Sequence, residues 1–213
     1  MTFTTTSSSH RTPILKNNWI KLYLLIFISV WIYTVTATSD LNNWLLENAL
    51  VILFLVMLGI GYRKYQMSDL SYLFILFFLC IHVYGSTYTY AENPFGYWLQ
   101  DLFHTKRNHY DRIVHFNFGF LLAYPLRELL LRVLKLPIWL TWLLPVEVAL
   151  SMGAAYELIE WAVADVFFKK QGAAYLGTQG DIWDAQKDMF LAFAGALLAI
   201  LIFALIKKTT RIK

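Results

Sequence analysis

Long apolar runs, separated by short polar segments, recur along the whole chain and limit what it can fold into. A helix needs about 20 apolar residues to cross a membrane. The runs cover residues 19–37, 44–60, 70–90, 111–134, 138–168 and 181–206. The chain is 58% hydrophobic and 15% charged, whereas a soluble domain is about 45–50% apolar and 25% charged. We therefore expect an all-α polytopic membrane helical bundle with about six transmembrane helices.

These runs leave room for one domain. We expect a flexible cytoplasmic tail at residues 1–18, a single transmembrane helical domain at 19–206 and a basic cytoplasmic tail at 207–213. The run 138–168 is too long for one simple span, and Pro145 is expected to divide it into an interfacial piece and a span. A cleaved signal peptide is an alternative for 19–37, but its cleavage-like sequence is poor.

The distribution of Lys and Arg predicts the orientation, because cytoplasmic loops of membrane proteins carry an excess of both. With six crossings and both termini in the cytoplasm, twelve of the 18 basic residues face inward. They are Arg11, Lys16, Lys21, Arg63, Lys64, Arg127, Arg132, Lys135, Lys207, Lys208, Arg211 and Lys213. We expect a multi-pass protein of the bacterial inner membrane, with the lipid bilayer as its partner. Nucleic acid is not expected to bind, because the basic residues follow the topology.

Ionisable residues lie near the ends of three spans, at spacings that place them on one helical face. The three sets are Asp111 and His115; Glu157 and Glu160; and Asp181, Asp184 and Asp188. The expected topology brings all of them to the outer half of the membrane. A charge at the bilayer centre costs about 2.5–3.5 kcal/mol on insertion scales. These carboxylates must therefore bind protons, a metal ion or a cationic partner.

A metal centre is one interpretation of these sets, because carboxylate and imidazole groups on facing helices build such sites. The candidate ligands for Zn, Mn or Fe are Asp111, His115, Glu157, Glu160, Asp184 and Asp188. In an enzyme, the candidates for metal binding or acid–base catalysis are Asp184, Asp188, Glu157 and His115. The candidates for holding an anionic head group are Arg112, Lys106 and Arg107. Two other interpretations stay open: a structural network of ion pairs and helix caps, and a proton or substrate relay.

The blocks around these residues resemble a known family. They comprise His82, Tyr84-Gly85, Arg107-Asn108, Tyr110-Asp111-Arg112, His115-Phe116, Tyr156-Glu157, Glu160-Trp161 and the run 175–189. From about residue 20 to 206 the chain resembles the YjdF-like family of small bacterial inner-membrane proteins, whose function is unknown. It is more weakly similar to VanZ-like membrane proteins, in which Lys stands in place of Arg112 and Asn in place of Asp188. Neither resemblance implies a reaction.

Three kinds of function fit these features. The first is a metal-dependent envelope enzyme or lipid-handling protein with a polar site at the outer membrane face. The second is a small transporter or proton-coupled carrier, although the polar residues crowd one side of the membrane. The third is a non-catalytic scaffold that binds another envelope protein through the loops 92–110 and 169–180. The loop 92–110 is also expected to hold a short interfacial helix at Tyr97–His104.

Overall fold

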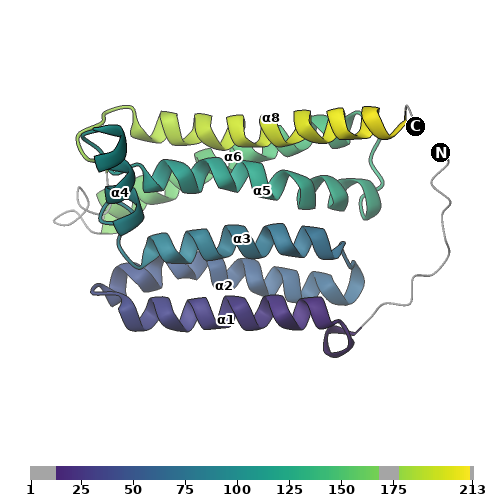
Figure 1. Cartoon of the computed structure of the whole chain (residues 1–213), viewed down its shortest axis with the longest axis horizontal. Helices are drawn as coiled ribbons and strands as arrows, with labels where there is room; N and C mark the ends of the chain where they lie inside the picture. Colours follow the sequence, from purple (N-terminus) through teal and green to yellow (C-terminus); the bar gives the residue numbers. More distant parts are fainter. Residues whose placement is uncertain (1–12, 168–177, 212–213) are drawn as a thin grey trace.

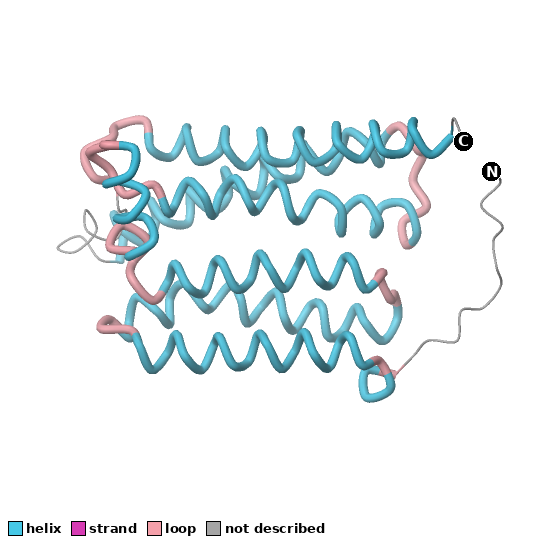
Figure 2. The backbone as a smooth tube through the Cα atoms, in the orientation of Figure 1, coloured by secondary structure: helices cyan, strands magenta, loops and turns pink. Residues whose placement is uncertain are grey.

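Six long helices run side by side in a computed structural model that describes residues 13–167 and 178–211 (Figure 1). They are α1 (Asn18–Ala37), α2 (Leu41–Lys64), α3 (Asp69–Ser86), α5 (Tyr110–Arg132), α6 (Leu140–Ala162) and α8 (Asp184–Arg211). The shorter elements are a 3-10 turn at Ile14–Lys16, α4 (Pro94–Phe103) and a π-helical extension of α6, Val163–Phe167. The described residues contain no strand (Figure 2), so the expected all-α fold is confirmed.

Five of the long helices are apolar and long enough to cross a membrane. They are α1, α2, α3, α6 with its extension, and α8. The exception is α5, which has Asp111 and Arg112 at one end and Arg127, Glu128 and Arg132 at the other. It packs against α3, α6 and α8, so neighbouring helices shield much of its surface from lipid. A helix in that position can carry polar residues that a lipid-facing helix cannot.

The long helices form two groups of three (Figure 1). In one group α3 contacts both α1 and α2, and in the other α5, α6 and α8 contact one another. The two groups meet mainly where α3 packs on α5. Each group has a cluster of buried apolar side chains, around Leu79 and Val83 in the first and around Ala196 and Ala199 in the second.

Two glycines allow the close contact between α5 and α8. A Cβ atom on Gly119 would clash with the carbonyl oxygen of Ala192, and one on Gly195 would clash with that of Phe116. Small residues let helix backbones approach in this way. The close approach keeps the polar residues at the start of α8 beside those at the start of α5.

The expectation that Pro145 divides the fifth apolar run is wrong. Helix α6 continues through this residue from Leu140 to Ala162. Proline removes one backbone donor, but membrane helices tolerate it where neighbouring groups satisfy the freed carbonyl. Pro145 is fully buried, and the uninterrupted helix carries Glu157 and Glu160 to the same end of the bundle as α4 (Figure 1).

The short helix α4 lies across the end of the bundle (Figure 1). Asn93 caps it by accepting hydrogen bonds from the N–H groups of Phe95 and Gly96, and Pro94 occupies its first turn. Trp98 and Phe103 are among its exposed apolar side chains. A short helix is therefore present where one was expected, and it begins three residues earlier than predicted.

Candidate functional site

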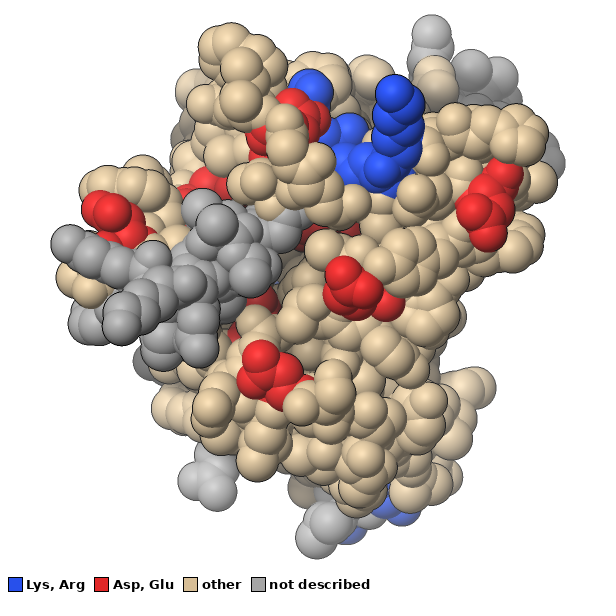
Figure 3. Space-filling view, turned by 90° about the vertical axis from the view of Figure 1, so that its left-hand side faces the viewer, with Lys and Arg blue, Asp and Glu red and all other residues tan. Residues whose placement is uncertain are grey.

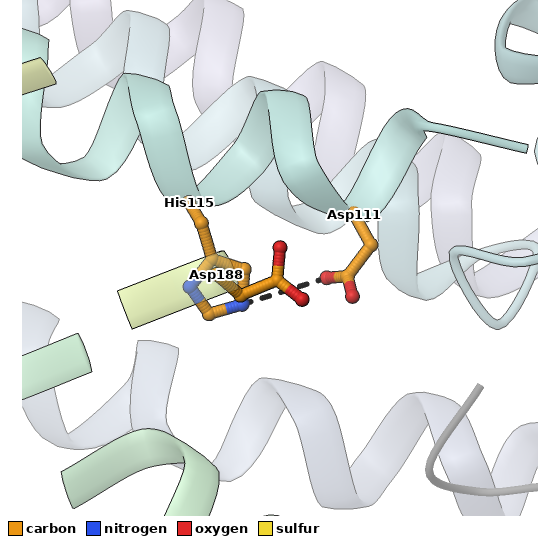
Figure 4. Close-up of side chains that lie close together, drawn as sticks. All are labelled: Asp111, His115 and Asp188. Atoms are coloured by element: carbon orange, nitrogen blue, oxygen red, sulfur yellow. Dashed lines mark ion pairs between the residues drawn. The ribbon is translucent and has the colours of Figure 1, made fainter. Parts of the chain in front are cut away.

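Side chains from α5 and α8 meet at the end of the bundle where α4 lies. Figure 4 shows Asp111 and His115 of α5 pointing toward Asp188 of α8. One potential ligand atom from each of the three lies within 4.8 Å of the other two. His115 Nε2 is 3.6 Å from Asp111 Oδ1 and 3.4 Å from Glu157 Oε1 on α6. Three helices thus bring oxygen and nitrogen ligands to one point.

Asp188 is the most enclosed member of this group. Its exposed fraction is 1%, and its Oδ1 atom has no hydrogen-bond partner among the described residues. A buried carboxylate oxygen without a donor is costly. Such an oxygen requires a proton, a water molecule or a cation to satisfy it.

A cavity of about 310 Å³ adjoins these residues. Six carboxylates line it, together with apolar and backbone groups at its rim. The acidic residues are Asp111, Glu157, Glu160, Asp181, Asp184 and Asp188. Figure 3 looks onto this end of the molecule, where acidic side chains form several separate patches on a mostly uncharged face and basic ones gather near the top of the view. The cavity therefore combines an apolar rim with an acidic lining.

Two arginines neutralise the carboxylates nearest the start of α8. Arg107 contacts Asp184 at 2.6 Å and also donates to the backbone carbonyl of Thr178. Arg112 contacts Asp181 at 2.5 Å and Asp184 at 3.4 Å. The side chains of Arg107 and Asp184 are only 10% and 8% exposed. These pairs leave Asp111, Glu157, Glu160 and Asp188 as the acids of the cavity without Lys or Arg partners among the described residues.

The charged groups at the rim also shift each other's protonation. Hydrogen bonds from the Lys187 side chain and the Trp183 N–H, with a further bond from Arg112, hold the pKa of Asp181 well below its usual range. Burial, helped by the positive charges of Arg112 and Arg107, lowers the pKa of His109. Asp181 therefore stays ionised at neutral pH and keeps its cationic partners in place.

The segment after α4 is attached to the turn before α8. The backbone N–H of Asn108 donates to the Gln179 side chain, which donates back to the Asn108 carbonyl. The Asn108 side chain donates to the Asn93 carbonyl at the start of α4. These hydrogen bonds thus hold the cavity rim at Thr178–Asp184 against the loop that contains Arg107 and Asn108.

Glu47 is a buried acid that the sequence interpretation did not single out. It lies on α2, is 6% exposed, and accepts a hydrogen bond of 2.7 Å from the Tyr156 hydroxyl of α6. The Tyr156 ring meets the His115 ring edge to face. The signal was available, because Glu47 is an acid within the apolar run 44–60. The polar network therefore joins both helix groups.

The structure places most of the proposed site residues together. Asp111, His115 and Asp188 form the central group, Glu157 contacts it, and Glu160 lines the same cavity. Asp184 also lines the cavity, while both arginines hold its carboxylate. Lys106 is exposed on the loop after α4 and does not line the cavity. The loop expected at 169–180 lies mostly outside the described residues.

Comparisons with known proteins agree with the first resemblance. A family described as "Predicted membrane protein (DUF2238)" matches residues 19–209. The chain is 38% identical over 181 residues to the inner membrane protein YjdF of Escherichia coli (strain K12), covering 82% of this chain and 84% of that protein. No solved structure matches the chain, and the similarity to VanZ-like proteins finds no support. The chain is an inner-membrane protein embedded in the lipid bilayer and belongs to the YjdF-like DUF2238 family.

Proposed function

We propose that this inner-membrane protein crosses the bilayer six times and presents the cavity at the outer face. In this topology α5, the fourth span in chain order, joins the five apolar helices as a further crossing, and both termini lie in the cytoplasm. The start of α1 and the end of α8 lie at one end of the bundle, opposite α4 (Figure 1). The inward excess of Lys and Arg supports that orientation. Residues 19–206 form the transmembrane domain between a polar tail and a basic tail.

The cavity is proposed to bind a divalent metal ion, with Zn, Mn and Fe as candidates. The observation that carries this proposal is the convergence of Asp111, His115 and Asp188, with the buried Asp188 Oδ1 lacking a partner among the described residues. Imidazole with carboxylate suits these metals. Glu157, beside His115, is the next ligand. A metal ion there would supply Lewis-acid chemistry to an ester or phosphoryl group.

The substrate is proposed to be an envelope lipid that reaches the cavity from the outer leaflet. Trp161 and Ile182 line the cavity and are 57% and 84% exposed, so an acyl chain meets an apolar rim while its head group enters the acidic interior. Arg112, which pairs with Asp181 and Asp184 of the cavity lining, is the proposed contact for an anionic head group, and the exposed Lys106 is a proposed contact outside the cavity. Arg107 positions Asp184 through their ion pair.

Metal content tests this proposal most directly. Protein purified in detergent without chelators is expected to carry bound Zn, Mn or Fe, measured by mass spectrometry of the ions. Asp188→Asn and His115→Ala are each expected to lose it, because each removes a ligand. Asp101→Asn is the matched control, because Asp101 is an exposed acid on α4 that does not line the cavity.

A metal-free wild-type protein that also fails to take up added Zn²⁺, Mn²⁺ or Fe²⁺ would overturn the metal proposal. Metal retained in both ligand variants would overturn the assignment of the ligands. Loaded protein in nanodiscs is then incubated with phospholipids and lipid-linked sugar phosphates. We expect a cleaved or transferred lipid product from the wild type and from Asp101→Asn, and none from Asp188→Asn.

A further inference from the structure

Two carboxylates of the cavity neither pair with Lys or Arg among the described residues nor belong to the central group of Asp111, His115 and Asp188. Asp181 and Asp184 pair with arginine, and Asp111 and Asp188 are the carboxylates of the central group. Glu157 and Glu160 remain. Among the described residues no Lys or Arg pairs with either one. Both line the cavity, where adjacent negative charges repel and favour a bound cation.

The positions of these two glutamates would allow both carboxylates to bind one cation. They lie three residues apart on α6 and therefore on one face of that helix. Glu157 Oε1 is 3.4 Å from His115 Nε2, so this carboxylate already touches the proposed metal ligands. The buried Asp188 Oδ1 lines the same cavity without a partner among the described residues, which supports cation binding in this space.

We propose that Glu157 and Glu160 hold a second divalent ion of the same kind, so that the cavity contains a two-metal centre. This inference rests on the metal site of the proposed function. The cavity of about 310 Å³ has room for two ions and several water ligands, since one water takes about 30 Å³. Helical bundles build such centres from inward-facing carboxylate and histidine side chains on several helices. Glu157 contacts His115 and lies three residues from Glu160 on α6, so it would be the ligand that both ions share.

Loading with Mn²⁺ alone tests this inference. The purified chain is stripped of metal, titrated with Mn²⁺ and measured by equilibrium binding and electron paramagnetic resonance. We expect about two ions per wild-type chain and a spectrum with magnetic coupling between them, because paired ions in such sites lie about 3.5–4 Å apart. Glu160→Gln is expected to bind about half as much Mn²⁺ and to lose the coupling. Asp101→Asn is expected to behave as the wild type.

The outcomes separate this inference from the proposed function. About one uncoupled ion per wild-type chain, unchanged in Glu160→Gln, would overturn the second site and leave the first intact. No Mn²⁺, Zn²⁺ or Fe²⁺ binding in the wild type would overturn both. Two ions that persist with their coupling in Glu160→Gln would also exclude this assignment. If that variant does not fold, the stoichiometry and coupling of the wild type still decide the question.

Discussion

The guanidinium of Arg107 is nearly enclosed between Asp184 and the Thr178 carbonyl. Removing one partner of a buried ion pair leaves the other charge uncompensated and costs about 3–5 kcal/mol. We expect Arg107→Ala to lower the free energy of unfolding by about that amount, measured by denaturant unfolding in detergent. Lys106→Ala is the control, because its side chain is exposed. An equal loss in both variants would contradict this account.

His109, two residues after Arg107, is expected to make the stability of the folded protein depend on pH. Burial, with the charges of Arg112 and Arg107, lowers its pKa in the folded protein. Below a pH of about 6.5, His109 binds a proton more readily in the unfolded chain than in the folded protein. The free energy of unfolding therefore falls as the pH falls. We expect the midpoint of thermal unfolding to drop less in His109→Gln than in the wild type between about pH 7.5 and 5.5. Equal slopes in the two proteins would refute the prediction.

Helical periodicity explains which site residues could be predicted from the sequence. A spacing of three or four residues places Asp111 beside His115 and Glu157 beside Glu160 whatever the helices pack against. It contains no information about partners far along the chain. The pairing of Arg107 with Asp184 joins residues 77 positions apart, and it depends on how α5 packs on α8. Glu47 is missed for the same reason, because its partner Tyr156 lies on α6.

At the scale of the helices, α5 and α8 pack so closely that no space is left for a side chain at Gly119 or Gly195. Gly195→Ala adds a Cβ against the Phe116 carbonyl, and overpacking costs about 1–3 kcal/mol. Gly59→Ala on α2 is the matched control, because its Cβ meets nothing within 4 Å. We expect Gly195→Ala to lower thermal stability in detergent and Gly59→Ala to leave it unchanged or raise it. A stable Gly195→Ala would show that the two helices separate easily.

Apolar runs predict where the long helices lie, but they do not show which helix is central. α5 contains charged residues at both ends and is still surrounded by α3, α6 and α8. The charges near its C-terminal end have local partners: Glu128 accepts hydrogen bonds from Ser68 at the start of α3 and pairs with Arg132. Tertiary packing also allows α6 to continue through Pro145. The local preference of proline, which is to end a helix, does not predict this.

For the whole molecule, the proposed orientation can be tested by labelling single cysteines. Lys106 follows α4 on the proposed outer side, and Leu134 lies just after α5 on the proposed inner side. In a Cys80→Ser background, we expect Lys106→Cys to react with a membrane-impermeant maleimide in intact spheroplasts. Leu134→Cys should react only after the membrane is permeabilised. The reverse pattern would place both termini outside and the cavity in the cytoplasm.

The hydrogen bond between Glu47 and Tyr156 has a consequence for how the chain enters the membrane. Its two residues are 109 positions apart, and a ribosome adds about 5–20 residues per second. About 5–20 seconds therefore separate the synthesis of Glu47 from the synthesis of its partner, Tyr156. During that interval α2 carries an unsatisfied acid that lipid disfavours. The packing of the first three helices is thus completed only after α6 has been synthesised. Until then the insertion machinery or the membrane surface must keep the Glu47 carboxyl group out of the lipid.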